Sequence, residues 1–250
     1  MRKKHVLVIS VMLFFFLMQP YKIQAAQNSL DNKLLNDTLL TALSPHISKE
    51  IINYYGYMKQ YGLYDVEILS INRESEGGFG FEVKVLVETF EHAHNPPYGK
   101  ETITFQVTPS GIETINFIHQ GDKEEKIVEK FYQDAITDIK NSFNLDLNTY
   151  EQYTYDQLFY KAEVQKDYKP LLDIVENIIV NILNPETKAP YKNVIDPVTY
   201  IKDNKGFILF KRADGTNVVY TVEKKDGKWQ VIDKKTKQGK QMKKELIWYM

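Results

Sequence analysis

The sequence contains no cysteine. Disulfide bonds are therefore excluded, and the fold must be stabilised by an ordinary hydrophobic core. A bacterial lipoprotein anchor is excluded too, because the lipid is attached to a cysteine at the cleavage site. We also find no LPxTG-type sorting signal near the C-terminus. Free secretion, or loose retention at a cell wall, is the expectation that follows.

Catalytic signatures are missing as well. The chain has no Gly-x-Ser-x-Gly, no His-Glu-x-x-His and no phosphate-binding glycine loop. The glycine-rich residues 77–80 precede a strand, whereas a dinucleotide-binding loop must open a helix. A pair of carboxylates for glycoside cleavage stays open, because the 33 acidic residues offer many pairs of unknown separation. The prediction is a non-catalytic protein, with an enzyme as the alternative.

Arginine is scarce. After the first residues only Arg73 and Arg212 remain, and the formal net charge of the whole chain is −1. The first 25 residues carry four basic residues and no acid, so without them the net charge falls to about −5. Recognition of nucleic acid uses basic surfaces and bidentate arginine. Nucleic acid is therefore not an expected partner.

No apolar run is long enough to cross a membrane comfortably. A basic start at residues 2–4 is followed by thirteen mainly apolar positions, 6–18, where a spanning helix needs about 20. This order, ending in small residues, is typical of a secretory signal peptide. We expect cleavage after Ala25, because Ile23 and Ala25 suit the two specificity positions, and a secreted product without a stable membrane anchor. An uncleaved anchor is the alternative.

Residues 30–120 are predicted to form a first α+β module. Its start, residues 30–61, is helical, because apolar residues recur every four positions. Pro45 interrupts this stripe, which predicts two consecutive helices or one kinked helix ending at Gly56. Period-2 alternation then predicts a four-stranded antiparallel meander whose apolar face is covered by the helices. The expected strands are 66–73, one from 79 onward, 101–108 and 112–119.

Residues 124–234 are predicted to form a second module of the same kind. An amphipathic helix covers 127–139, a tyrosine-rich run follows, and another helix begins at Pro170 and stops before Pro185. Four short strands joined by tight turns come next, at 198–202, 207–212, 217–224 and 229–234. The fold class is therefore α+β, with two small modules of cystatin-like or nuclear-transport-factor-like shape.

Residues 235–250 are predicted to form a C-terminal tail with a basic start and an aromatic end. The tail could rest on anionic wall polymer or lipid headgroups. Alternatively, its last residues dock on the second module. Docking is favoured, because an unburied Leu-Ile-Trp-Tyr end would be a sticky surface patch.

The loop 91–99 carries the closely paired histidines and the Pro-Pro step of the chain. His92 and His94 can present two imidazoles on one side of an extended segment, a spacing that suits a transition metal. Glu88 shares a face with His92 and is the expected third ligand. Glu91 and His119 are further candidates, although His119 belongs to the opposite face of a regular sheet.

A binding surface without a metal is the favoured hypothesis for the same loop, so no cofactor is expected and a divalent metal is the alternative. Tyr98 behind two prolines could form an aromatic platform for a glycan or a peptide, or it could pack over the end of the sheet. The loop could also be polar and merely stiffened by its prolines. The candidate ligand-binding residues are His92, His94, Asn95, Pro96, Pro97 and Tyr98.

The first module resembles a known family. The resemblance rests on Leu39 with Leu43-Ser44-Pro45, on Tyr64-Asp65, on the segment 89–99 and on Ile103-Thr104-Phe105. These residues resemble the family catalogued as domain of unknown function 3888 (DUF3888), exported proteins of endospore-forming Gram-positive bacteria. The resemblance covers about residues 34–117, and residues 93–99 are its most specific part. It implies an extracytoplasmic bacterial setting and no assigned activity.

The sequence as a whole predicts a secreted bacterial protein that binds an extracellular or cell-wall ligand without catalysis. Two alternatives stay open. One is a metal-binding or hydrolytic enzyme that uses His92 and His94. The other is a structural protein of the cell wall that is held by its C-terminal lysines.

Overall fold

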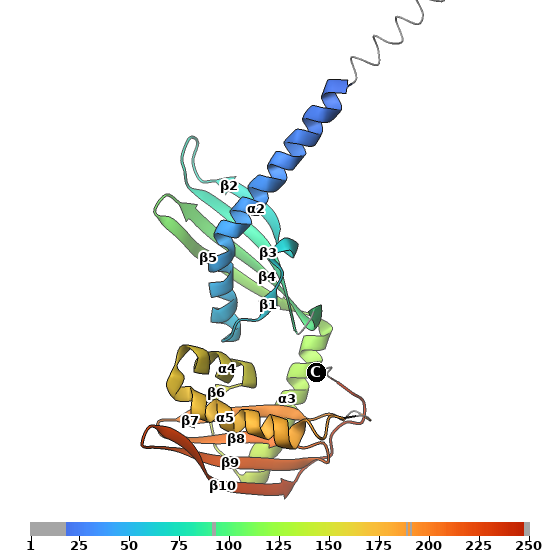
Figure 1. Cartoon of the computed structure of the whole chain (residues 1–250), viewed down its shortest axis with the longest axis vertical. Helices are drawn as coiled ribbons and strands as arrows, with labels where there is room; N and C mark the ends of the chain where they lie inside the picture. The colour runs from blue at the N-terminus through green and yellow to red at the C-terminus, as the bar shows by residue number, and fades with distance from the viewer. Residues whose placement is uncertain (1–18, 92–93, 189, 191, 248–250) are drawn as a thin grey trace, which may run out of the picture.

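The computed structural model describes residues 19–91, 94–188, 190 and 192–247. Two antiparallel sheets with their helices make up this part of the chain, which confirms the α+β class (Figure 1). The first group of elements is α2 (Gln19–Tyr55), β1 (Gln60–Tyr61), η1 (Leu63–Asp65), β2 (Glu67–Arg73), β3 (Phe81–Glu91), β4 (Asn95–Thr108) and β5 (Gly111–Gly121). Helix α3 (Lys123–Phe143) leads from this group to the second sheet.

The second group follows α3. It contains β6 (Glu151–Tyr153), α4 (Tyr155–Val164), η3 (Lys166–Tyr168), α5 (Lys169–Ile178), the π-helical η4 (Ile179–Leu183), β7 (Ile195–Lys202), β8 (Lys205–Lys211), β9 (Thr216–Lys225) and β10 (Lys228–Gln238). None of the described helices combines the length and the apolar character that crossing a membrane requires.

Helix α2 is one continuous helix that runs through Pro45, so the single-helix alternative is the one observed. Proline has no N–H to offer the preceding turn, but packing of the apolar stripe on the first sheet outweighs that local cost. Leu43, Ile47 and Ile51 of the stripe are fully buried, whereas Leu35 is 67% exposed. The N-terminal part of α2 extends beyond the first sheet (Figure 1). Gly56, at a φ of +78°, ends the helix as predicted.

The first sheet is the expected meander of β2, β3, β4 and β5, with the short β1 added beside the far end of β3. Helix α2 covers the face that carries the alternating valines of β3 and the buried Ile103 and Phe105 of β4. The prediction of a loop from 91 to 99 was wrong. Strand β4 already begins at Asn95, and Glu91 pairs with Asn95 while Thr89 pairs with Gly99. Pro96–Tyr98 form the extra residues of a bulge, a place where strands tolerate proline.

The second sheet has the order β10-β9-β8-β7-β6 and is covered on both faces. Helix α3 packs on the face that carries Leu209 and Val219. Helices α4 and α5 pack on the face that carries Ile208 and Phe210. Because neighbouring side chains of β8 enter opposite cores, all three residues from Ile208 to Phe210 are buried.

The segment after β10 docks on the second group of elements. The side chain of Asn193 donates to the carbonyls of Lys243 and Glu245 and accepts from the N–H of Ile247. Met242 and Ile247 pack against the core under α3. The predicted start of the tail at 235 was wrong, because β10 continues pairing with β9 to Gln238. Residues 248–250 lie outside the described part.

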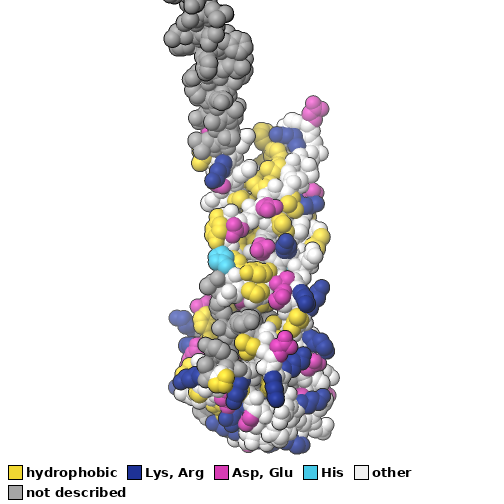
Figure 2. All heavy atoms as spheres, turned by 90° about the vertical axis from the view of Figure 1, so that its right-hand side faces the viewer, with side chains coloured by type: hydrophobic (Ala, Val, Ile, Leu, Met, Phe, Trp, Pro, Cys, Tyr) yellow, Lys and Arg dark blue, Asp and Glu magenta, His cyan; other side chains and the backbone are white. Residues whose placement is uncertain are grey.

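The surface differs between the two groups of elements. On the face shown in Figure 2, hydrophobic side chains run along the part that holds the first sheet, and lysine and arginine side chains gather over the second part. Acidic side chains lie among these basic ones, so this face does not carry a field of a single sign. The polar groups considered next lie between the two sheets, where α2 ends and α3 begins.

Candidate functional site

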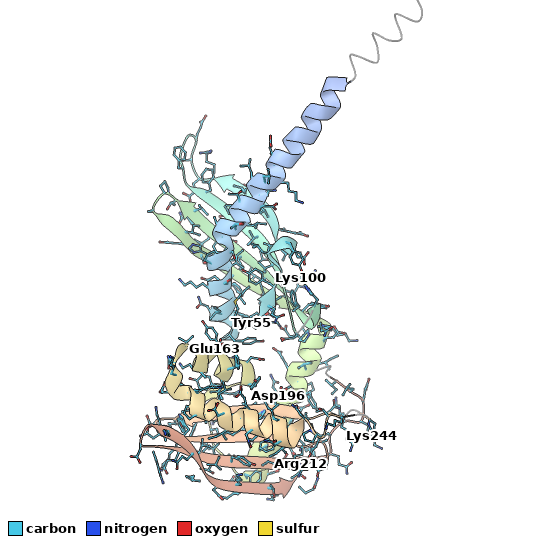
Figure 3. All side chains as sticks on the ribbon, in the orientation of Figure 1. Tyr55, Lys100, Glu163, Asp196, Arg212 and Lys244 are labelled. Carbon is cyan, nitrogen blue, oxygen red and sulfur yellow. The ribbon has the colours of Figure 1, made fainter. Side chains whose placement is uncertain are left out.

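A cluster of polar side chains, here called the Glu101 cluster, lies under the end of α2. Figure 3 marks Tyr55 at this end of the helix. The cluster consists of Tyr55 from α2, Thr89 from β3, Glu101 from β4, His119 from β5 and Glu125 from α3. Glu101 is its centre and has no exposed surface. A carboxylate with no access to water must be satisfied by protein donors.

Glu101 receives three such donors. The hydroxyl of Tyr55 donates to Oε1 at 2.6 Å, and the hydroxyl of Thr89 donates to the same oxygen at 3.0 Å. The ring atom Nδ1 of His119 lies 2.9 Å from Oε2. Burial raises the pKa of Tyr55, and its bond to Glu101 raises it further, so the phenol keeps the proton that it donates.

His119 lies between two carboxylates. Its Nδ1 contacts Glu101, and its Nε2 lies 2.9 Å from Oε2 of Glu125. Both ring nitrogens can donate only when the imidazole is protonated. Burial on its own lowers the pKa of His119, but the hydrogen bonds and charges of Glu101 and Glu125 outweigh it and raise the pKa above 6.5. The two carboxylates therefore favour the protonated form of His119, an imidazolium with one carboxylate at each ring nitrogen.

Two glycines make room for the cluster. Gly99 of β4 and Gly121 of β5 are direct partners across the strands. A Cβ at Gly99 would come within 2.6 Å of the Thr89 hydroxyl and also crowd Glu101 and the Tyr55 hydroxyl. A Cβ at Gly121 would overlap the carboxylate of Glu125. The absence of side chains at this pair of positions is what lets the charged groups enter.

Alanine at Gly99 should therefore be costlier than alanine at Gly121. At Gly99 the added methyl group meets three groups that are hydrogen-bonded to one another, two of them fully buried, and we expect a loss of about 1–3 kcal/mol in the free energy of unfolding. At Gly121 it meets the far end of Glu125, which can swing away, so we expect a smaller loss. Urea unfolding of both variants measures the difference. Equal losses, or a larger loss at Gly121, would contradict this view of the cluster.

Lys59 extends the cluster to the surface. Its side chain is only 3% exposed, and Nζ lies 3.3 Å from Glu91 and 4.0 Å from Glu125. The same ammonium group lies 4.7 Å from the ring centre of Tyr55. Glu125 thus touches two cations, His119 and Lys59, and Lys59 in turn touches two carboxylates. The order of alternating charges is His119, Glu125, Lys59, Glu91.

A cleft of about 170 Å³ opens where this chain of charges ends. One wall is the segment between α2 and β1 together with Glu91, and the other wall is α4. The amide of Gln157 on α4 joins the walls by donating to the carbonyl of Tyr55 at 2.8 Å. Figure 3 marks Glu163 on α4, beside the end of α2. The lining residues are Tyr57, Met58, Lys59, Gln60, Glu91, Asp156, Phe159, Tyr160 and Glu163.

The described residues among those proposed from sequence lie at the tip of the β3–β4 hairpin instead. His94 is exposed, its ring stacks on Phe90 and its Nε2 lies 3.1 Å from the hydroxyl of Tyr64. The hydroxyl of Tyr98 donates to the carbonyl of His94 at 2.6 Å. Asn95, Pro96 and Pro97 begin β4. These contacts brace the hairpin, and none of these residues lines the cleft.

The predicted metal ligands can be placed only in part. His92 lies outside the described residues. Glu88 is exposed and lies opposite Lys100 in the register of β3 and β4. His119 points inward to Glu101, on the opposite face of the sheet, as expected. Among the residues that the structure describes, no group of three or more histidine, cysteine or acidic side chains is placed to hold a metal ion. Whether the hairpin tip binds a metal stays a prediction.

Sequence reasoning missed Tyr55, Lys59, Glu101 and Glu125 as members of one cluster. A signal existed for Glu101, because it shares the parity of the inward-facing Ile103 and Phe105. A charged residue at an inward position indicates a buried partner. Nothing in the local pattern pointed to Glu125 or to α4, since tertiary packing brings both to this place.

The fold and the cluster define the first group of elements as a small helix-on-sheet unit with a buried charged centre. Residues 35–120 match the family described as "Protein of unknown function (DUF3888)". The resemblance predicted from sequence is thereby confirmed for this segment, about a third of the chain. No curated protein and no solved structure matches the chain. The matched segment contains the Glu101 cluster except Glu125, and it contributes one wall of the cleft, while α4 lies outside it.

Proposed function

We propose that the protein is a non-catalytic binding protein whose ligand site is the cleft between the end of α2 and α4. The observation that carries this proposal is the lining of the cleft, in which aromatic rings and carboxylates face one open space. Small-molecule sites in proteins are concave, with apolar walls and a few polar groups that orient the ligand. The nearby histidine favours binding over catalysis, because both of its ring nitrogens are engaged by carboxylates.

The ligand that suits this lining carries a positive charge. The rings of Tyr57, Phe159 and Tyr160 offer the faces that attract ammonium and guanidinium groups. Glu91, Asp156 and Glu163 add three carboxylates to the lining, and Lys59 is the one basic residue among the lining residues. An amine or a basic peptide side chain meets both requirements in a space of this size.

The setting that we propose for this binding is outside the cytoplasm. Residues 1–25 have the basic start, short apolar run and small-residue end of a secretory signal peptide. The absence of cysteine from the sequence is compatible with an oxidising compartment, because no thiol has to be protected there. The ligand would then be an extracellular or cell-wall molecule.

Amines should raise the thermal unfolding midpoint of the purified protein. A ligand that binds only the native state adds about 2.7 kcal/mol of stability at a hundredfold excess over its dissociation constant. We expect lysine, cadaverine and spermidine to raise the midpoint, and glutarate to leave it unchanged. Glu163→Gln, which removes a carboxylate of the lining, should weaken the effect several-fold.

Asp173→Asn is the matched control for this experiment. Asp173 is an exposed acid on α5 that pairs with Lys169 and does not line the cleft. Its variant should respond to amines as the unchanged protein does. No rise with any amine, or the same weakening in Asp173→Asn as in Glu163→Gln, would overturn the proposed site.

A further inference from the structure

We propose that His119 regulates the cleft by controlling which carboxylate holds Lys59. Loss of the imidazolium proton frees Glu125 to draw Lys59 away from Glu91, and the released Glu91 carboxylate then binds the cation of the ligand. The cleft accordingly binds cations more tightly as the pH rises. This inference rests on the proposed function and names how the same site is regulated.

The geometry places Glu125 between two cations. Its Oε2 lies 2.9 Å from Nε2 of His119, whereas its Oε1 lies 4.0 Å from Nζ of Lys59. Lys59 is 3.3 Å from Glu91 and is therefore closer to the carboxylate that lines the cleft. In this arrangement His119 is the nearer of the two cations to Glu125, and Glu91 is the nearer of the two carboxylates to Lys59.

Loss of the proton from His119 changes its contact with Glu125. A neutral imidazole has a single N–H. Glu101 has no exposed surface and cannot turn to water, so the remaining proton stays on Nδ1 and donates to Glu101. The lone pair of Nε2 then faces the carboxylate of Glu125, which is a repulsive contact. Glu125 lies in the first turn of α3 and is partly exposed, so its side chain can turn toward Lys59.

The other titratable groups that face His119 come from α2, β4 and α3. From α2, the rings of Tyr54 and Tyr55 lie 4.7 and 5.8 Å from its ring centre. Burial raises the pKa of both tyrosines. Carboxylate charges raise the pKa of Tyr54 further, and the hydrogen bond to Glu101 raises that of Tyr55 further, so both stay neutral. From β4 and α3 the facing groups are the carboxylates of Glu101 and Glu125. Histidine is the side chain whose ordinary pKa lies near neutrality.

The direction of the pH dependence follows from these contacts. Burial alone would lower the pKa of His119, but Glu101 and Glu125 raise it above the ordinary 6.5. The stabilisation by the imidazolium is fully present below pH 6.5 and is lost as the pH rises through the higher folded pKa. The affinity of the cleft for a cation should rise through the same window.

Calorimetric titration of the full chain with cadaverine, from pH 5.5 to 8.5 at constant ionic strength, tests the inference. We expect the affinity to rise about fivefold, the change that one ion pair of modest strength gives. His119→Gln lacks the imidazole that faces Glu101 and Glu125, so its affinity should not depend on pH in this range. The matched control is His46→Gln on α2, a histidine outside the cluster that lies by β5, and it should keep the full pH dependence.

A second measurement separates the regulation from the binding itself. The imidazole resonances of His119 should titrate above pH 6.5 in the unchanged protein and at lower pH in Glu125→Gln. Cadaverine binding without pH dependence, or an unaltered His119 titration in Glu125→Gln, overturns the regulation alone. Absence of cadaverine binding at every pH overturns the proposed function and, with it, its regulation.

Discussion

Replacing Asp138 by alanine should destabilise the protein by about 3–5 kcal/mol, the cost of leaving a buried charge without its partner. Lys211 of β8 is only 2% exposed, and its ammonium group donates to Asp138 of α3 at 2.6 Å and to Asn217 of β9 at 2.7 Å. Asp138 also accepts from Asn217 and from the backbone N–H of Lys240. One carboxylate thus joins α3, two strands and the C-terminal segment.

Two comparisons make this prediction specific. Asp134→Ala on the same helix removes an exposed ion pair with Lys130, and pairs of that kind contribute about 0–1 kcal/mol. The double variant Asp138→Leu with Lys211→Met replaces both charges by apolar groups and should recover most of the loss. Urea unfolding measures all three variants. A loss of unfolding free energy in Asp138→Ala no larger than that in Asp134→Ala would contradict the prediction that Asp138 is the partner of a buried charge.

The same ion pair should make the protein sensitive to acid. Burial on its own raises the pKa of Asp138, but the bonds from Lys211, Asn217 and the N–H of Lys240 outweigh it and lower the pKa from 3.8 to about 2. Because the folded pKa is the lower one, the stabilisation is present above pH 3.8 and is lost as the pH falls through about 2. Asp138→Ala should lack this part of the acid transition.

Replacing Glu101 by alanine should have an effect of similar size, about 3–5 kcal/mol, for the same reason. The substitution leaves the His119 imidazolium with one of its two carboxylates. It also removes the acceptor of the buried Thr89 hydroxyl and of the partly buried Tyr55 hydroxyl. A buried donor without a partner costs about 1–3 kcal/mol. Thermal and urea unfolding measure the loss.

Glu101→Gln separates the charge from the hydrogen bonds. The amide oxygen can still accept from Tyr55 and Thr89, so we expect a smaller loss than in Glu101→Ala. The pKa of His119 should fall, because the Glu101 charge is one cause of its rise. Glu113→Ala, an exposed acid near the start of β5 and six residues from His119, is the control and should change stability by less than 1 kcal/mol or so. An unchanged free energy of unfolding in Glu101→Ala would contradict the role of Glu101 as the buried centre of the cluster.

The fold could be predicted from local patterns where one face of an element is buried. The four-residue repeat of α2 and the alternation in β3 each mark a single apolar face, and the helix end at Gly56 has its own local signal. The hairpin at Pro96 was predicted as a loop because proline cannot donate to a strand ladder. The structure places it in a bulge, where the missing donor costs little.

The site could be predicted much less well. The histidine pair at 92 and 94 stood out because its residues are neighbours in sequence, but the groups that converge in space come from five different elements. Glu101 and His119 carried a signal in their inward parity. No signal in the sequence pointed to the wall formed by α4. The packing of α4 against the end of α2 decides which residues of that helix meet the first sheet.

A map of backbone chemical-shift changes on addition of cadaverine tests whether the cleft is the ligand site. We expect changes concentrated at residues 57–60, at Glu91 and along α4, and their loss in Glu163→Gln. Changes confined to the hairpin tip around His94 and Tyr98, or to the C-terminal segment after Gln238, would contradict the claim that the cleft is the ligand site.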